Sequence, residues 1–130
     1  IMFDNGLAHR IEAGNDMFLM PSRYEPCGLN QLYSLKYGTL PVVRKTGGLA
    51  DTITDATQEN IENGSATGFM FENYRSADLL DAIKRSINLY NNRKAWRQMV
   101  QTAMNQDWSW GNSAGKYAEL YEKVVGWKDA

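Results

Sequence analysis

The chain has 130 residues, of which 43% are hydrophobic and 12% aromatic, and its formal net charge is −1. These values suit one globular domain with a single core, and they exclude wholesale disorder. The 14 basic and 15 acidic residues leave no basic stripe, so we expect no nucleic-acid partner. The single cysteine, Cys27, excludes an intramolecular disulfide and a cysteine-rich metal site.

Short apolar runs and glycine stops predict alternating helices and strands in the first half of the chain. We expect helices over residues 7–13 and 29–37, because apolar residues recur there at helical spacing and a glycine follows each segment. The apolar runs at 16–20 and 40–43 predict strands that are buried on both faces. The candidate core residues of the second helix are Leu29, Leu32, Tyr33 and Leu35.

The second half is predicted to be helical around one further strand. Residues 44–51 should form a glycine-containing loop with a brief helical turn, and residues 55–66 a polar surface loop. A third strand is expected at 67–71, followed by a helix to about residue 90 with Ser76 as its N-cap. The core side of that helix should carry Leu79, Leu80, Ile83 and Ile87. The remaining predicted helices cover residues 94–105 and 112–125.

This order of elements indicates an α/β protein, with part of a doubly wound parallel sheet and C-terminal helices. We interpret residues 1–130 as a single partial domain, because no linker or internal repeat interrupts them. No apolar run reaches about 18 residues and no secretory signal is visible, so we expect no membrane association. The chain begins with Ile1-Met2-Phe3, and we therefore expect it to be a piece of a longer polypeptide.

The segment EPCGLNQ places a carboxylate and a turn directly before a helix start. Unpaired backbone N–H groups and a partial positive charge at a helix N-terminus favour an anion such as a diphosphate. Gly28 would let the backbone approach a ligand, and Glu25 could accept hydrogen bonds from sugar hydroxyls or stabilise positive charge at an anomeric carbon. A purely structural interpretation, in which Glu25 caps the helix and Gly28 turns the chain, is equally open.

Other candidate groups have plainer interpretations beside the functional ones. The RKTGG segment at 44–48 follows a strand at the expected ligand-bearing edge, but it lacks the spacing of a P-loop and could be a basic turn. His9, the only histidine, fits a structural or surface position. Trp108 and Trp110 could stack on sugar rings, although tryptophans near the end of a domain more often anchor a terminal helix. Phe3 could stack on a nucleobase or belong to the core.

The chain resembles bacterial glycogen synthases and plant starch synthases over nearly its whole length. The resemblance is carried by PSRYEPCGLNQLYSLKYGTLPVVRKTGGLADTI, with LAHRIEAGND before it and TGFMFE and DWSWGNSAGKYAELY after it. Those enzymes elongate α-1,4-glucan from a nucleotide-activated glucose. The resemblance implies the later part of the second Rossmann-type domain of a glycosyltransferase with the GT-B architecture.

The same resemblance implies roles for individual residues. Glu25 would lie in the active site beside the donor sugar, as an electrostatic and orienting group. Backbone groups of Cys27 and Gly28 would meet glucose hydroxyls, and those of Leu29 and Asn30 would lie near the diphosphate. The other implied substrate-binding residues are Phe3, which would stack on the adenine, and Thr46 and Gly47 near the cleft.

The reaction implied is glucose transfer from ADP-glucose to the non-reducing end of an α-1,4-glucan, with retention of configuration and without a metal ion or other cofactor. Tyr33 stands where related retaining transferases carry a second glutamate, as expected for the glycogen-synthase branch. Bacterial members would act in the cytoplasm and plant members in plastids. The family's N-terminal domain and its diphosphate-binding Arg and Lys lie outside the sequence, so we predict an inactive isolated chain whose exposed sheet edges could drive self-association.

Two other classes of function stay open. A stand-alone sugar- or nucleotide-binding module would use the same loop for recognition without chemistry. A flavodoxin-like regulatory domain fits the alternation of strands and helices, but the loop at 25–28 argues against it. Such receivers need an acidic cluster and an acceptor aspartate after a strand.

Overall fold

The computed structural model describes residues 4–126 of the chain. Within them lie three strands and seven helices, in an order close to the predicted one. In chain order these are α1 (Asn5–Ala13), β1 (Met17–Met20), α2 (Asn30–Tyr37), β2 (Leu40–Arg44), α3 (Gly47–Thr52), α4 (Gln58–Glu62), β3 (Phe69–Phe71), α5 (Ser76–Asn91), α6 (Arg93–Asn105) and α7 (Trp110–Gly126).

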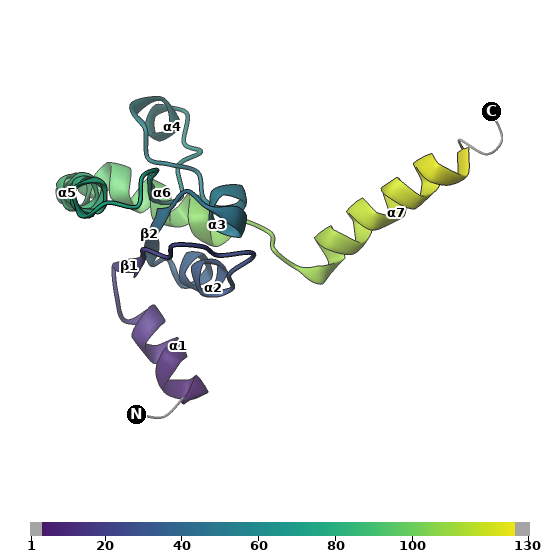
Figure 1. Cartoon of the computed structure of the whole chain (residues 1–130), viewed down its shortest axis with the longest axis horizontal. Helices are drawn as coiled ribbons and strands as arrows, with labels where there is room; N and C mark the ends of the chain where they lie inside the picture. The colour runs from purple at the N-terminus through teal and green to yellow at the C-terminus, as the bar shows by residue number, and fades with distance from the viewer. Residues whose placement is uncertain (1–3, 127–130) are drawn as a thin grey trace.

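The three strands form one parallel sheet in the order β1-β2-β3 (Figure 1). Met17 pairs with Leu40, and Val42 pairs with Phe69. β2 lies between the other two strands and is buried along almost its whole length. The carboxyl ends of the strands therefore meet at one edge, where open α/β sheets bind their ligands. The predicted α/β class with a parallel sheet is confirmed.

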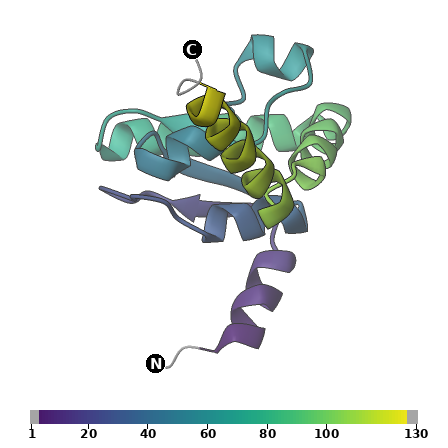
Figure 2. The same cartoon turned by 90° about the vertical axis from the view of Figure 1, so that its right-hand side faces the viewer.

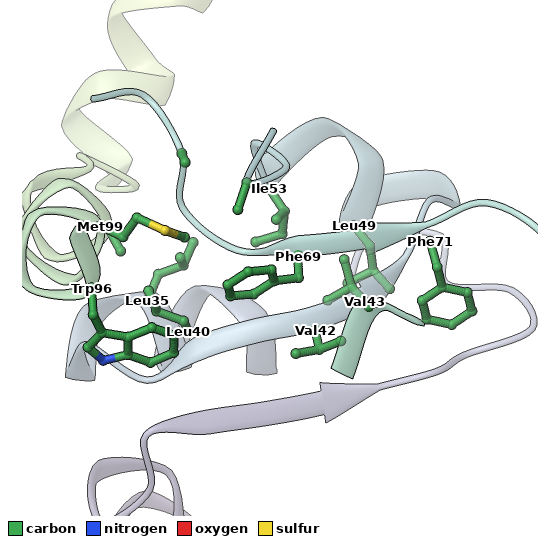
Figure 3. Packing of buried hydrophobic residues seen from close by; sticks show 14 residues of the cluster. Leu35, Leu40, Val42, Val43, Leu49, Ile53, Phe69, Phe71, Trp96 and Met99 are labelled. Atoms are coloured by element: carbon green, nitrogen blue, oxygen red, sulfur yellow. The ribbon is translucent and has the colours of Figure 1, made fainter. Parts of the chain in front are cut away.

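Aromatic packing joins the sheet to the helices of the second half. Phe69 of β3 stacks on Trp96 of α6 with ring centroids 6.2 Å apart, and Tyr90 of α5 meets Trp96 edge-on at 5.1 Å. Leu40 and Met99 belong to the same buried cluster (Figure 3). Full burial of one such side chain stabilises a protein by roughly 1.5–3 kcal/mol. This packing therefore stabilises α5 and α6 against the sheet, at the amino ends of β2 and β3.

The burial predicted for the first half is wrong at two places. β1 is not buried on both faces, because Leu19 is half exposed. It is also an edge strand, paired only with β2 among the described residues. In α2, Leu32 and Leu35 face the core as predicted, but Tyr33 and the preceding Leu29 are exposed, contrary to prediction. The buried residues of α2 are Gln31, Ser34 and Leu35. Their spacing of three and four residues places them on one side of the helix.

Three features of the second half also differ from prediction. The polar segment expected to be a loop contains α4, which begins where the Thr57 hydroxyl accepts a hydrogen bond from the Asn60 N–H at 3.2 Å. The N-cap of α5 is Arg75 and not Ser76, because Arg75 has the extended backbone of a cap (φ −136°, ψ 144°) and Ser76 is already helical. β3 begins at Phe69, two residues later than expected.

The core face of α5 is narrower than its leucines and isoleucines suggest. Leu79 and Ile83 pack against the core, as predicted. Leu80 and Ile87 are each half exposed, contrary to prediction. The fully buried residues of this helix are Ala82 and Ser86. Small residues at these positions let α5 lie close to the sheet. The larger leucine and isoleucine side chains therefore lie on either side of this contact.

The two terminal helices extend away from the sheet in different directions (Figures 1 and 2). Trp110, the first residue of α7, is 89% exposed, so the interpretation that it anchors this helix is wrong. Trp108 lies in the connection before α7, where its indole N–H donates to Gln106 Oε1 at 3.3 Å. Within residues 4–126, the helices are too short or too polar to cross a bilayer.

Candidate active site

Two loops lie against each other at the carboxyl edge of the sheet. One loop (21–29) follows β1, and the other (45–46) connects β2 to α3. The backbone N–H of Gly48 donates to the carbonyl oxygens of Glu25 and Pro26, both at 3.2 Å. Arg44, at the end of β2, donates to the carbonyl oxygens of Arg23 and Glu72 and so joins the loops after β1 and β3. These bonds make the edge one connected surface.

The N-terminus of α2 opens onto this surface without a side-chain cap. Its N-cap residue is Leu29, which has no side chain able to accept a hydrogen bond. Among the described residues, no acceptor bonds the backbone N–H groups of Gly28, Leu29 or Asn30. Free N–H groups and the positive end of the helix dipole together favour an anion. α2 therefore presents free backbone donors at the place where the sequence predicts an anion site.

Gly28 and Gln31 form the turn that leads into α2. Gly28 has φ +74°, a left-handed conformation that residues with a Cβ rarely adopt. A Cβ on Gly28 would also lie 2.5 Å from Gln31 Oε1. Gln31 is fully buried, and its Nε2 donates to the carbonyl oxygens of Cys27 at 3.1 Å and Gly28 at 3.0 Å. Sequence reasoning missed Gln31, because a position three residues after the glycine does not by itself show that the side chain is buried against the loop.

The paired glycines after β2 lie directly beneath the Glu25 loop. A Cβ on Gly47 would be 2.0 Å from the Glu25 carbonyl oxygen, and one on Gly48 would be 2.0 Å from the Cys27 carbonyl oxygen. Any larger residue would therefore displace the loop. Thr46 is the N-cap residue of α3, with its side chain bonded to no helix N–H. The glycine pair supports the loop from below by close backbone contact.

Glu25 lies partly buried in the loop between β1 and α2. The Ser22 hydroxyl donates to Glu25 Oε2 at 3.3 Å, and this is the one side-chain hydrogen bond that the carboxylate accepts from the described residues. The Glu25 carbonyl is held by Gly48. A fixed backbone and a carboxylate with spare acceptor capacity are what a group facing a polyhydroxylated ligand requires.

The structure brings most of the predicted site residues to this edge. The residues placed there are Glu25, Cys27, Gly28, Leu29, Asn30, Thr46 and Gly47. The thiol of Cys27 is free and exposed. Phe3 lies outside the described residues. His9 lies elsewhere, because its Nδ1 is 3.1 Å from the hydroxyl of Tyr37 at the far end of α2.

The site is an open surface in this chain. A cavity of about 650 Å³ lies beside it, between α2 and the connection to α7, and it is lined by Leu29, Tyr33 and Trp108 among others. Glu25, Cys27 and Gly28 line none of five open surface pockets on the described residues. Within residues 4–126, no three His, Cys, Asp or Glu side chains are grouped so that they could hold a metal ion.

Comparison with known families identifies the chain. The family described as "Glycosyl transferases group 1" matches residues 5–102, from the start of α1 into α6. The chain belongs to this family. The matched region includes the whole carboxyl edge described above, so the site lies within the part that defines the glycosyl transferase.

The curated relatives of this glycosyl transferase chain include bacterial glycogen synthases. The glycogen synthase of Glaesserella parasuis is 53% identical over 125 residues, which are 96% of this chain and 26% of the relative. Glycogen synthase 1 of Methylococcus capsulatus is also 53% identical over 125 residues, 96% of this chain and 25% of the relative. The predicted resemblance to glycogen synthases is confirmed, and the chain spans about a quarter of the length of these relatives.

A solved plant structure has the same fold. The catalytic domain of starch synthase IV from Arabidopsis thaliana, bound to ADP and acarbose, superposes with a TM-score of 0.84 at 38% sequence identity. The match covers 97% of this chain and 26% of that one. The glycosyl transferase fold predicted from the sequence is therefore confirmed by a structure as well as by sequence relatives.

Proposed function

We propose that this chain is the donor-binding part of a glycogen or starch synthase. The complete enzyme would transfer glucose from ADP-glucose to the non-reducing end of an α-1,4-glucan, with retention of configuration. The observation that carries the proposal is the uncapped N-terminus of α2, which presents free backbone N–H groups beside the Glu25 carboxylate. An anion site next to a carboxylate fits a sugar diphosphate. The diphosphate needs hydrogen-bond donors and positive potential, whereas the sugar hydroxyls need an acceptor.

In the proposed complex the diphosphate lies at the start of α2. The N–H groups of Leu29 and Asn30 donate to its oxygens, and the helix dipole adds positive potential there. This end of the donor therefore needs no metal ion from the chain. Backbone groups of Cys27 and Gly28 meet glucose hydroxyls. The other residues that we place near the donor are Phe3, against the adenine, and Thr46 and Gly47.

Glu25 is proposed to face the glucose ring. A carboxylate there would orient the sugar by accepting hydrogen bonds from hydroxyls, and it would stabilise positive charge that develops at the anomeric carbon. A preorganised charge of this kind is often the largest single contribution to catalysis. The backbone of Glu25 is held by Gly48, so the carboxylate is positioned before the substrate arrives.

ADP-glucose is proposed as the donor in preference to UDP-glucose. The support comes from the Arabidopsis starch synthase IV structure, which is 38% identical to this chain and is described as bound to ADP and acarbose. Competition between ADP-glucose and UDP-glucose in the full-length enzyme would decide the preference. A kcat/KM that favours UDP-glucose would refute this part of the proposal.

The role of Glu25 is tested by the Glu25→Ala and Glu25→Gln variants of the full-length enzyme. We expect kcat to fall by about 10²–10³-fold, as when a preorganised charge-stabilising group is removed. The KM for ADP-glucose should change much less, because the N–H groups of α2 remain. Glu59→Ala, which removes an exposed carboxylate from α4, serves as the matched control. Normal turnover by Glu25→Ala would rule out the assigned role.

The isolated chain is proposed to lack transferase activity. It spans about a quarter of the length of its relatives, and the proposed reaction needs an acceptor site and cationic groups for the leaving ADP. Incorporation of labelled glucose into glycogen by purified residues 1–130 would contradict this. Binding of ADP without any turnover in the full-length protein would instead favour a stand-alone nucleotide-binding module.

A further inference from the structure

Gln31 is a polar residue on the core-facing side of α2. It is fully buried, beside the equally buried Ser34 and Leu35. A buried amide is unfavourable unless its polar atoms are hydrogen-bonded. Here Nε2 faces three acceptors: the loop carbonyls of Cys27 at 3.1 Å and Gly28 at 3.0 Å, and the Thr52 hydroxyl of α3 at 3.4 Å.

The orientation of this amide is determined by its neighbours. Exchanging Oε1 and Nε2 would set a carbonyl-type oxygen against two backbone carbonyl oxygens, which repel it. Nε2 therefore faces the loop, and Oε1 is left buried without a hydrogen-bond partner among the described residues. Such an unpaired acceptor destabilises the fold. The unpaired Oε1 is the consequence of an orientation in which Nε2 holds two carbonyls of the site loop.

Holding these carbonyls also sets the direction of two N–H groups. The peptide unit is planar and trans, so the C=O of one residue and the N–H of the next point in opposite directions. With the Cys27 and Gly28 carbonyls turned inward to Gln31, the N–H groups of Gly28 and Leu29 are turned outward. No acceptor among the described residues bonds either of them.

Gln31 is also connected to the glycine pair under the loop. The Thr52 hydroxyl, which accepts from Gln31, donates to the Gly48 carbonyl at 2.6 Å. The Gly48 N–H in turn donates to the carbonyls of Glu25 and Pro26. A single chain of hydrogen bonds, which we name the Gln31 network, therefore runs from Gln31 through Thr52 and Gly48 to the backbone of Glu25.

We propose that Gln31 is a positioning residue for donor binding. It does not touch the substrate; it fixes the outward N–H groups that hold the donor and, through Thr52 and Gly48, the backbone that carries Glu25. This inference rests on the proposed function, because the donor is the ligand that these groups would hold. The expected consequence is that loss of Gln31 weakens nucleotide binding more than it weakens the fold.

The first test compares Gln31→Met with Thr39→Val in the full-length enzyme. Thr39 is the matched control, because its buried hydroxyl also faces two backbone carbonyls, those of Glu12 and Asn15, at a distance from the site. We expect Gln31→Met to raise the Kd for ADP and the KM for ADP-glucose by about tenfold, as for the loss of a hydrogen-bond contribution. Thr39→Val should leave both within about twofold at a similar loss of thermal stability.

The second test uses pH in the nearly isosteric Gln31→Glu variant. When protonated, the new carboxyl can donate one hydrogen bond to the loop carbonyls, and burial raises the pKa of such a group. When ionised, it repels them. ADP affinity of this variant should therefore be close to wild type at acidic pH and fall as pH rises, relative to wild type at each pH. A merely structural role predicts parallel pH curves for the two proteins.

The outcomes separate this inference from the function on which it rests. If the wild-type enzyme neither binds ADP nor transfers glucose, the proposed function fails, whatever the variants do. If the wild type is active and Gln31→Met binds ADP as Thr39→Val does, the positioning role is overturned. Should Gln31→Met fail to fold, the Gln31→Glu variant carries the test. A loss of ADP affinity as pH rises supports the proposal, and pH curves parallel to those of wild type refute it.

Discussion

The two ends of α2 differ in how their backbone groups are satisfied. At the carboxyl end, Gly38 adopts φ +79° and the N–H groups of Gly38 and Thr39 donate to the carbonyls of Leu35 and Ser34. At the amino end, no side chain caps the helix. One end is closed by the protein itself, and the other leaves its donors free for a ligand.

The two ends also use buried polar side chains for different purposes. Thr39 faces the Glu12 and Asn15 carbonyls and joins α1 to β2. Gln31 holds two carbonyls of the loop before its own helix, and its own oxygen stays unpaired. At the closed end the protein itself supplies the hydrogen bonds to the Ser34 and Leu35 carbonyls, and these bonds serve the fold. At the open end Gln31 Oε1 stays buried without a hydrogen-bond partner among the described residues, as expected where a structure serves binding.

The largest effect is expected from Gly48→Ala at the open end. Its new Cβ would lie 2.0 Å from the Cys27 carbonyl oxygen and 2.7 Å from two further Cys27 backbone atoms, so the loop must move. We expect a loss of about 3 kcal/mol in the free energy of unfolding and loss of donor binding. Thermal unfolding and ADP titration of the full-length protein measure both.

The control for this variant is Gly115→Ala in α7. No atom lies within 4 Å of the added Cβ, and alanine favours a helix, so stability should not fall. Equal unfolding temperatures and equal ADP affinities of the two alanine variants would mean that the glycine pair does not support the loop.

A smaller effect is expected from Thr39→Val at the closed end. The substitution keeps the shape of the side chain but removes the hydroxyl donor that faces the carbonyls of buried Glu12 and of Asn15. We expect a loss of about 1–3 kcal/mol in stability with unchanged transferase kinetics. Thr39→Ser keeps the hydroxyl and should recover most of the stability. A change in KM for ADP-glucose with Thr39→Val would show that the two ends are not independent.

The sequence predicts the fold well because its signals are local. The apolar runs before Pro21 and after Gly38 are short enough to be strands, and the glycine stops mark the ends of helices. The carboxylate and glycine in front of α2 likewise predict a site at a helix start. Their positions at one sheet edge follow from the parallel topology alone.

Other features could not be predicted because they depend on contacts distant in the sequence. The role of Gln31 requires a left-handed turn at Gly28 and a hydroxyl at Thr52, 21 residues further along. The exposure of α7 is a second case. An amphipathic pattern indicates an apolar face, but it does not identify what covers that face.

Gly38→Ala tests the cap at the closed end with a smaller effect than Thr39→Val. An L-residue in the left-handed region is strained by about 1–2 kcal/mol, and the new Cβ would lie 3.0 Å from Val100 Cγ1, a side chain able to shift. We expect a lower unfolding temperature and normal kinetics. Gly38→Asn should lose less, because asparagine tolerates this conformation. Identical losses for alanine and asparagine would argue that space, and not backbone conformation, limits the position.

The smallest effect is expected from Glu12→Gln, also at the closed end. Burial raises the pKa of the Glu12 carboxyl above its ordinary value of 4.5, although the nearby His9 lowers it in part. A raised folded-state pKa means that the folded protein keeps a proton which the unfolded chain releases, so Glu12 makes stability fall as pH rises through this window. Glu12→Gln removes this pH-dependent loss of stability, so the unfolding temperature of the variant should exceed that of wild type at neutral pH. The unfolding temperatures of the two proteins should converge below about pH 4, where the carboxyl is protonated in both the folded and the unfolded state. A variant less stable than wild type at neutral pH would mean that the ionised carboxylate is stabilised by partners other than His9. The closed end of α2 would then use charge as well as hydrogen bonds.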